Sequence, residues 1–409
     1  MLTPPECIRK SVVDSLESEV TQYKLVSRDE FTMTYELVLT DDRQVILRLP
    51  CSTGHASIVA AEVNTLRYIA SHTQIPVVEV LAFNGGSDDE STSSCFAVLQ
   101  KPPGICVETV FKKMSAFDQN LLIATVARWM VEVSKQPFDS IGSLAVATAQ
   151  NDFVVGPVVA KPFYTDGRSN VVLDRGPFKS AKAYYRACAQ REQDALRMLF
   201  VQDAPPYRQD LEESHLTVER IAGLFCDLIN RCQGLDEDDP EKAPFSLDIH
   251  ELGLKNVFVS PENPTRVSRI GKDPHDEAAR LAAIFKAEVS RVAGKGSAFE
   301  RALELDDAAR NTLDDLSTYD AFRDGFLLLP ALENILATLP GHEDVAGLTA
   351  ILDPSTLPGR AARINLLTRG SNVLYLAMTP PRSPRPAPVR PDDVDQASAD
   401  RGQGTLPVS

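Results

Sequence analysis

The stretch Phe245-Ser-Leu-Asp-Ile-His-Glu-Leu-Gly-Leu-Lys-Asn-Val-Phe-Val259 decides the fold of this chain. Within it a carboxylate, Glu251, stands five residues before an amide, Asn256, and an apolar strand follows at once. After a turn rich in proline, a second short strand is expected over residues 265–270. That strand ends at Gly271-Lys272-Asp273. The pattern predicts a loop that carries an acid and an amide and leads into a hairpin.

The composition limits the classes of protein to which this chain can belong. Its 409 residues are 43% hydrophobic, which is enough for one large core or two ordinary ones. The net charge of −15 argues against a nucleic-acid partner, because phosphate backbones attract basic surfaces. The seven cysteines show no C-x-x-C pair, the N-terminus lacks a secretory leader, and no apolar run is long enough to span a bilayer. We expect a cytoplasmic protein with free thiols and no membrane contact.

Hydrophobic patterns divide the chain into a β-rich first part and a helical remainder. Strands are expected over residues 32–40, 44–50 and 95–99, and a helix over 56–71. Amphipathic helices are expected further on, over residues 115–136, 180–200, 211–233, 275–293, 298–316 and 320–338. This order predicts the α+β class with segregated lobes. We expect an N-terminal lobe over 1–100, a helical lobe over 101–375 and a disordered Pro-rich tail over 376–409.

The acid and the amide suit phosphoryl transfer, in which catalysis comes from positioned charge. Glu251 would accept the proton of an attacking hydroxyl, and Asn256 would hold a metal ion on the nucleotide phosphates. His250 is interpreted as a surface or hydrogen-bonding histidine. Other catalytic patterns are missing: the sequence has no G-x-S-x-G, H-E-x-x-H, P-loop or G-x-G-x-x-G motif.

Phosphoryl transfer also requires a cation that neutralises the nucleotide phosphates and an acid that holds this cation in place. Arg48 ends the apolar strand Val45-Ile-Leu-Arg48, where kinases usually place a lysine. Glu62 lies in the apolar stripe of the following helix, with Ile58 and Leu66, and an unpaired carboxylate there would be costly. A buried pair between Arg48 and Glu62 accounts for both residues, although a strand-end arginine is also common by itself.

Taken together, these residues resemble the pattern of the aminoglycoside phosphotransferase and choline kinase-like superfamily, and most of all that of its fungal members. The resemblance covers about residues 30–340 in the order of the family. The matching segments are Glu62–Val80, Leu99–Gly104, Pro137–Leu144, Val155–Pro157, Asp174–Phe178 and Phe245–Val259.

The resemblance implies a bilobal, protein-kinase-like fold that binds ATP and Mg²⁺ between its lobes and phosphorylates a hydroxyl of a small molecule. By position, Arg48 and Glu62 would form the phosphate-binding ion pair, and the backbone of Leu99, Gln100 and Lys101 would meet the adenine. Glu251 would be the catalytic base and Asn256 a magnesium ligand.

Two departures from the family pattern concern the catalytic loop. The family motif is H-x-D-L-x-x-x-N, whereas Ile249 stands here at the histidine and Glu251 at the aspartate. The longer side chain moves the carboxylate by about an ångström, and a misplacement of that size can cost on the order of a hundredfold in rate. In addition, Lys272 occupies the position of the metal-binding aspartate, with Asp273 one residue late, and a further segment of the family is missing before residue 275.

Two hypotheses of different classes therefore stay open. The first is a small-molecule phosphotransferase, with activity weakened by these departures, in which Asp273 serves as the second metal ligand. The second is a pseudokinase, which keeps the fold as a binding or scaffold module. A protein serine/threonine kinase comes third, because the H-R-D, D-F-G and A-P-E segments are missing. The phosphate acceptor and the oligomeric state do not follow from the sequence.

Overall fold

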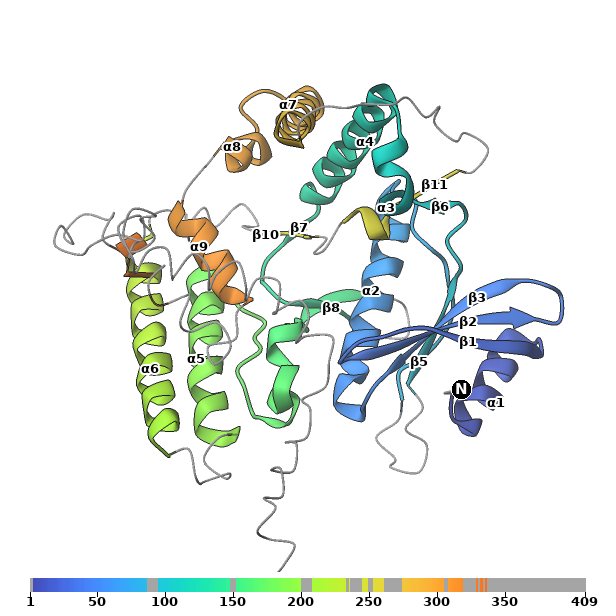
Figure 1. The fold of residues 1–409 in the computed structure, drawn as a ribbon, viewed down its shortest axis with the longest axis horizontal. Helices are drawn as coiled ribbons and strands as arrows, with labels where there is room; N and C mark the ends of the chain where they lie inside the picture. The colour runs from blue at the N-terminus through green and yellow to red at the C-terminus, as the bar shows by residue number, and fades with distance from the viewer. Residues whose placement is uncertain are drawn as a thin grey trace, which may run out of the picture. The chain divides into compact units, whose positions relative to one another are not determined.

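The first part of the chain forms a five-stranded antiparallel sheet with the strand order β1-β2-β3-β5-β4 (Figure 1). The structure is a computed structural model that describes residues 3–86, 95–147, 152–199, 208–232, 235, 245–248, 253–260, 274–304, 308–318, 329, 332, 333, 335 and 336. The strands are β1 Val20–Arg28, β2 Thr32–Leu39, β3 Gln44–Pro50, β4 Val80–Asn84 and β5 Phe96–Gln100.

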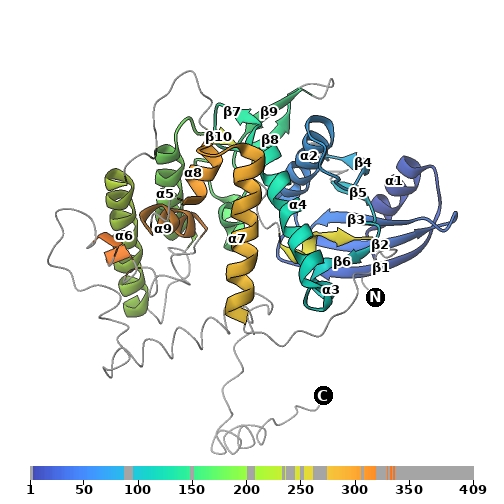
Figure 2. The ribbon, with the colours of Figure 1, turned by 90° about the horizontal axis from the view of Figure 1, so that it is seen from above.

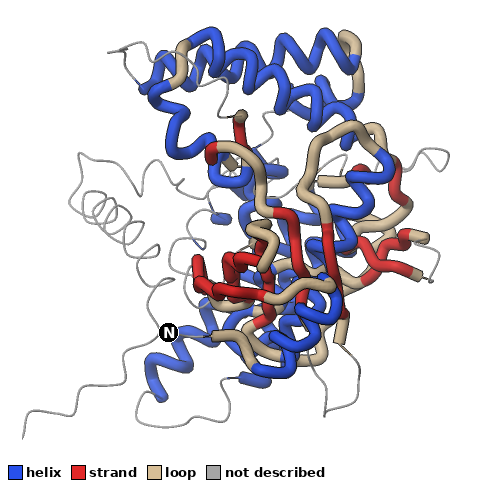
Figure 3. The backbone as a smooth tube through the Cα atoms, turned by 90° about the vertical axis from the view of Figure 1, so that its right-hand side faces the viewer, coloured by secondary structure: helices blue, strands red, loops and turns tan. Residues whose placement is uncertain are grey.

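One helix covers each face of this sheet (Figure 3). Helix α1, Glu6–Leu16, buries Ile8 and Val12 against alternate strand residues such as Leu37 and Leu47. Alternation follows from the strand geometry, since successive side chains point to opposite faces. The opposite face of the sheet receives α2, Ala56–His72.

Helix α2 lies where the sequence predicts it, and of the face expected to be apolar (Ile58, Glu62, Leu66 and Ile69) only Ile69 is buried. Val59 and Val63 are fully buried against the sheet, whereas Ile58, Glu62 and Leu66 are only partly buried. The helical period fits both stripes, and packing on the sheet selects the valines. Glu62 therefore lies at the margin of the buried face and not within it.

The remainder of the described chain is mainly helical. Its helices are α3 Val107–Val110, α4 Ala116–Ser134, α5 Ala181–Leu199, α6 Arg208–Arg231, α7 Pro274–Ala293, α8 Ala298–Glu304 and α9 Ala308–Ser317. Helix α4 begins at a capping residue, since the Ser115 hydroxyl accepts a hydrogen bond from the Asp118 backbone N–H at 3.2 Å. Helices α4 and α7 pack against each other (Figure 2), while α5, α6 and α9 share the largest core cluster.

Short strands and 3₁₀ helices connect these helices to the sheet. Three two-stranded ladders pair β6 Ile105–Cys106 with β11 Phe258–Val259, β7 Pro137–Phe138 with β10 Phe245–Ser246, and β8 Ser143–Val146 with β9 Phe153–Gly156. The 3₁₀ helices are η1 Thr53–His55, η2 Phe111–Lys113, η3 Lys161–Phe163, η4 Thr165–Asn170 and η5 Leu254–Asn256.

The predicted α+β class is confirmed, with an antiparallel sheet first and helices after it. The lobe boundaries at residues 100 and 375 stay predictions. The tail over 376–409, the expected strand over 265–270 and most of the helix expected over 320–338 lie outside the described residues. Within the described part of the chain, no helix combines the length and the apolar character that crossing a bilayer requires.

Candidate active site

An ion pair joins the third strand to helix α2. Arg48 Nη2 lies 3.0 Å from Glu62 Oε2, and Arg48 Nε donates a hydrogen bond to the same oxygen at 3.2 Å. A second N–H, from Nη1, is donated to the Thr34 hydroxyl at 2.9 Å. Thr34 is the cross-strand neighbour of Arg48, so the hairpin register places its hydroxyl there. The contact predicted between Arg48 and Glu62 is therefore present.

The pair is accessible, and this differs from the expected burial. The Arg48 side chain is 25% exposed and that of Glu62 is 34% exposed. A guanidinium carries five N–H donors, and the hydrogen bonds to Glu62 and Thr34 use one N–H of Nε and one of Nη1. The second N–H of Nη1 has no acceptor among the described residues. Arg48 can thus hold its helix partner and still bind an anion.

Residues 99–101 comprise the last two residues of β5 and the residue that follows it, and they differ in what they can offer a ligand. Leu99 is buried, and the Gln100 N–H is bound to the Glu79 carbonyl at 2.8 Å. Within the described part of the chain, the Lys101 N–H and carbonyl make no hydrogen bond with another residue. Pro102 comes next and has no N–H to offer. The Lys101 backbone is therefore the part of this segment that can pair with the edge of a base.

The Lys101 side chain is engaged elsewhere. Its ammonium donates to Glu36 Oε1 at 2.5 Å and to Gln44 Oε1 at 2.7 Å, which ties the end of β5 to β2 and β3. The hydrogen bond from Lys101, with added attraction from Lys24, holds the pKa of Glu36 below its ordinary value of 4.5. The Lys101 side chain thus joins the strands of the sheet.

Glu36→Gln is expected to reduce the loss of stability in acid. The folded-state pKa of Glu36 is below 4.5, so the stabilisation is complete above 4.5 and is lost as the pH falls through the folded value. Thermal unfolding of the wild type and the variant, followed from neutral pH to about pH 3, tests this. The difference in Tm between them should shrink in acid. The same substitution at the exposed Glu108 is the control, and an equal effect there would contradict the assignment to Glu36.

The loop that carries Asn256 is docked beside the segment that leaves the sheet. Strand β11 pairs with β6, and the Val107 N–H donates to the Val257 carbonyl at 2.8 Å. Gly104 allows this close approach, because its φ is +102° and a Cβ there would lie 2.2 Å from the Val259 carbonyl oxygen. Residues about 150 apart in the chain are therefore held together at this point.

Trp129, the single tryptophan, lies between two core clusters at the two ends of this loop. It packs against the cluster of Ile69, Ile75 and Val133, against which Leu247 before the loop also packs. It packs as well against the cluster that contains Val257, which follows the loop. Strand β10 is fixed in addition by pairing with β7. The segments before and after the loop are thus tied to clusters that include helix α4, which is the kind of rigid support that a functional loop needs.

The remaining predicted site residues are only partly described. Asn256 is exposed at the end of η5, and its N–H donates to the Gly253 carbonyl at 2.9 Å. Glu251, Lys272 and Asp273 lie outside the described residues, so their predicted roles stay predictions. No group of three metal-ligating side chains occurs among the residues that the structure describes.

Several site features were not predicted from the sequence, although the pairing of Thr34 with Arg48 could have been predicted. Thr34 and Arg48 lie equally far from Asp41, where the hairpin turns, so the register alone could have paired them. Glu36 lies two residues further along the same face. The support from Trp129 and the need for Gly104 depend on contacts between distant segments, and no local pattern announces them.

Comparison with known proteins finds relatives of low identity. No protein-family model matches the chain. A subtelomeric hrmA-associated cluster protein of Aspergillus fumigatus, found in two strains, is 23% identical over 158 residues. That match covers 36% of this chain and 31% of the relative, so the chain matches less than a third of the length of the relative.

Solved structures of phosphotransferases are also similar. The GDP and kanamycin complex of APH(2")-IIia is 13% identical and covers 79% of this chain and 97% of its own, with a TM-score of 0.40. A putative fructosamine-3-kinase from Thermobifida fusca is 13% identical, with coverages of 81% and 98% and a TM-score of 0.37. A macrolide 2'-phosphotransferase from Brachybacterium faecium is also 13% identical, with coverages of 79% and 96% and a TM-score of 0.36. All three structures are 13% identical to this chain, with TM-scores of 0.40 or lower.

Proposed function

We propose that this protein binds ATP and transfers its terminal phosphoryl group to a hydroxyl of a small molecule. The observation that carries the proposal is the ion pair between Arg48 on the third strand and Glu62 on the following helix. Kinases place a cation on the third strand and an acid on the following helix for the same purpose, to hold the nucleotide phosphates. Arginine keeps the charge of the usual lysine and can contact two phosphate oxygens at once.

The end of β5 and the residue after it, Lys101, support a position for the nucleotide base. The Lys101 N–H and carbonyl would pair with the adenine edge, and Leu99 would contribute an apolar contact. The same segment leads directly into β6, which is paired with the strand that follows Asn256. A nucleotide held by Lys101 at one end and by Arg48 at the other would therefore lie near the loop with the acid and the amide.

The proposal assigns a separate role to each site residue. Arg48 would neutralise charge on the phosphates, and Glu62 would keep the guanidinium in place. Glu251 would accept the proton of the attacking hydroxyl, and Asn256 would hold Mg²⁺ on the phosphates together with Asp273. The nucleotide supplies the phosphoryl group, and the chain supplies position and charge.

The pseudokinase remains the second candidate, and specific residues favour it. Lys272 stands where the family has a metal-binding aspartate. Lysine can donate hydrogen bonds to phosphate but cannot ligate magnesium. A protein of this kind would bind nucleotide through Arg48 and Lys101 without turnover.

Formation of ADP separates the two candidates. Purified protein would be incubated with ATP, Mg²⁺ and a panel of small alcohols, amino alcohols and sugars. The phosphotransferase predicts that at least one of them raises ADP release above the rate with ATP alone. Nucleotide binding without any acceptor-dependent release, or no nucleotide binding at all, would overturn the phosphotransferase and favour the pseudokinase.

A further inference from the structure

The segment from Phe163 to Asn170 in the helical part contacts two elements of the candidate site. The Ser57 hydroxyl, in the first turn of α2, donates a hydrogen bond to the Tyr164 hydroxyl at 3.1 Å. The Asp166 N–H donates to the Glu30 carboxylate in the β1–β2 turn at 3.1 Å. The two contacts come from residues more than 100 positions apart in the chain, so they tie the helical part to the sheet.

An aromatic side chain strengthens the same junction. Phe31, from the β1–β2 turn, is 5% exposed and belongs to the core cluster that contains Phe163 and Tyr164. Ile58 of α2 packs against this cluster as well. The β1–β2 turn therefore buries an apolar residue in the helical part instead of leaving it in solvent, which gives the contact a sizeable hydrophobic component.

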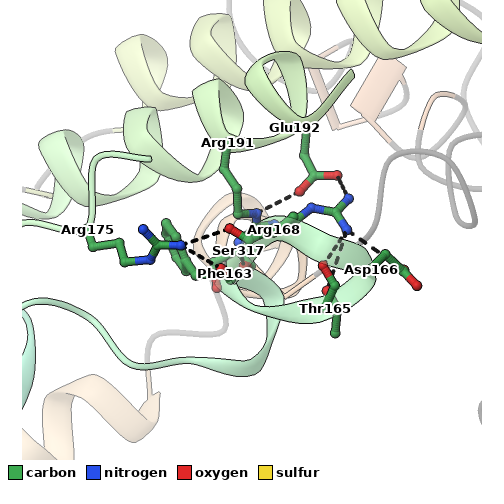
Figure 4. A network of polar contacts seen from close by, with 8 residues as sticks. All are labelled: Phe163, Thr165, Asp166, Arg168, Arg175, Arg191, Glu192 and Ser317. Atoms are coloured by element: carbon green, nitrogen blue, oxygen red, sulfur yellow. Dashed lines mark hydrogen bonds and ion pairs between the residues drawn. The ribbon is translucent and has the colours of Figure 1, made fainter. Parts of the chain in front are cut away.

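A buried charge network holds the Tyr164 segment in one conformation (Figure 4). Arg168 Nη2 lies 3.0 Å from Glu192 Oε2, and Arg191 Nε lies 2.6 Å from Glu192 Oε1. The three side chains are at most 2% exposed. Arg191 also donates to the Ser317 carbonyl at 3.0 Å, which connects the network to α9. Such a network specifies one arrangement, because a displaced arginine would leave a buried charge without its partner.

Arg175 fixes the backbone of the same segment. Its Nη2 donates to the carbonyl oxygens of Phe163 and Arg168, both at 3.0 Å (Figure 4). Its guanidinium lies 5.1 Å from the centre of the Tyr164 ring. Two positions in between, Asp166 and Gly167, have positive φ values of 49° and 81°. The segment is thus a tightly held turn, and its Tyr164 hydroxyl contacts Ser57 of α2.

The geometry of α2 connects this hydroxyl to the candidate site. Glu62 lies four residues after Ile58 and five after Ser57. The part of α2 that contacts the Tyr164 segment is therefore about one helical turn away from Glu62. In kinases the loop between the first two strands covers the nucleotide phosphates. The segment around Tyr164 contacts the elements that carry both of these features.

We propose that Tyr164 is a positioning residue that holds α2 and the β1–β2 turn in place for nucleotide binding. The part of this inference that concerns nucleotide rests on the proposed function, whereas the effect on α2 and the turn does not. Loss of the Tyr164 hydroxyl should free the first turn of α2 from the helical part. The β1–β2 turn should loosen with it, because Phe31 packs in the same cluster.

Hydrogen exchange of Tyr164→Phe tests the inference. The variant keeps the ring, with its packing and its contact with Arg175, and removes one hydrogen bond. We expect amides in residues 29–32 and 53–62 to exchange about fivefold faster, as the loss of one hydrogen bond implies. Ser57→Ala should give the same pattern, and the double variant should exchange no faster than either single one, because both remove the same contact.

Tyr185→Phe is the matched control. This tyrosine belongs to the same core cluster but donates its hydroxyl hydrogen bond to Asp314, away from α2. Faster exchange in the control at the same segments, or unchanged exchange in Tyr164→Phe, would overturn the inference.

Saturating Mg²⁺ and ATP should restore slow exchange in Tyr164→Phe, because the ligand selects the positioned form. Binding of nucleotide without this recovery would overturn the positioning role. Absence of nucleotide binding to the wild type would instead contradict the proposed function, and the effect of Tyr164 on exchange of the free protein would still stand.

Discussion

Glu251→Gln is expected to lower turnover with a hydroxyl acceptor by about 10²- to 10⁴-fold, which is the usual contribution of a general base. The amide is nearly the same size as the carboxylate but cannot accept the proton of the acceptor hydroxyl. Binding of ATP should change little, because the acid is assigned to the acceptor and not to the phosphates. We therefore expect the loss in kcat, with the KM for ATP preserved.

Two further variants complete this experiment. Glu251→Asp keeps the charge and should retain more activity than Glu251→Gln. Glu108→Gln makes the same chemical change at an exposed position on α3, which packs against η5, and should leave turnover unchanged. If Glu251→Gln turned over as fast as the wild type, another group would be the base and the assignment of the catalytic loop would fail.

Arg48→Met is expected to weaken ATP binding by about 10- to 100-fold, which corresponds to the loss of charged hydrogen bonds to phosphate. Methionine fills much of the space of the arginine stem, so the effect should come from charge and hydrogen bonding. Arg48→Lys keeps the charge but cannot reach Glu62, Thr34 and a phosphate in the same geometry, and it should fall in between. Titration calorimetry with Mg²⁺ and a non-hydrolysable ATP analogue measures the effect.

Arg43→Met is the matched control, because Arg43 lies in the turn just before the same strand and pairs with Asp41 at 2.6 Å. Its loss should not change affinity. Glu62→Gln should weaken binding less than Arg48→Met, since the guanidinium would remain but would be less well held. The two site variants should be non-additive, because they act through one ion pair. Equal affinity in Arg48→Met and the wild type would contradict the phosphate-binding role.

Much of the sheet could be predicted from the sequence because its signals are local. Residues 32–40 are rich in residues that favour strands, and the turn at Asp41 defines the hairpin, so β2 and β3 begin and end within a residue of the expected positions. Helices α4, α5 and α7 likewise match their predicted ranges to within two residues. The contact of Arg48 with Glu62 followed from chemistry, since a charged residue among apolar ones calls for a partner.

What the sequence did not predict depends on segments far apart in the chain. Phe31 looks like an ordinary turn residue, and its burial arises only when the turn meets the cluster around Phe163. Arg191 and Glu192 are neighbours in an amphipathic helix, where charged side chains usually face solvent. Their burial depends on Arg168, 24 residues earlier than Glu192, and on the end of α9. Helix α1 was not expected either, because only packing on the sheet defines its apolar face.

A thermal-shift titration of the wild type with ATP and Mg²⁺ tests nucleotide binding at this site most directly. A ligand that binds only the folded state stabilises it by about 2.7 kcal/mol at roughly 100 times its Kd. We predict a clear rise in Tm with Mg²⁺ and ATP, a much smaller rise for Arg48→Met at the same concentrations, and a normal rise for Arg43→Met. No rise for the wild type at millimolar nucleotide, or equal rises for all three proteins, would contradict a nucleotide site built around Arg48 and Glu62.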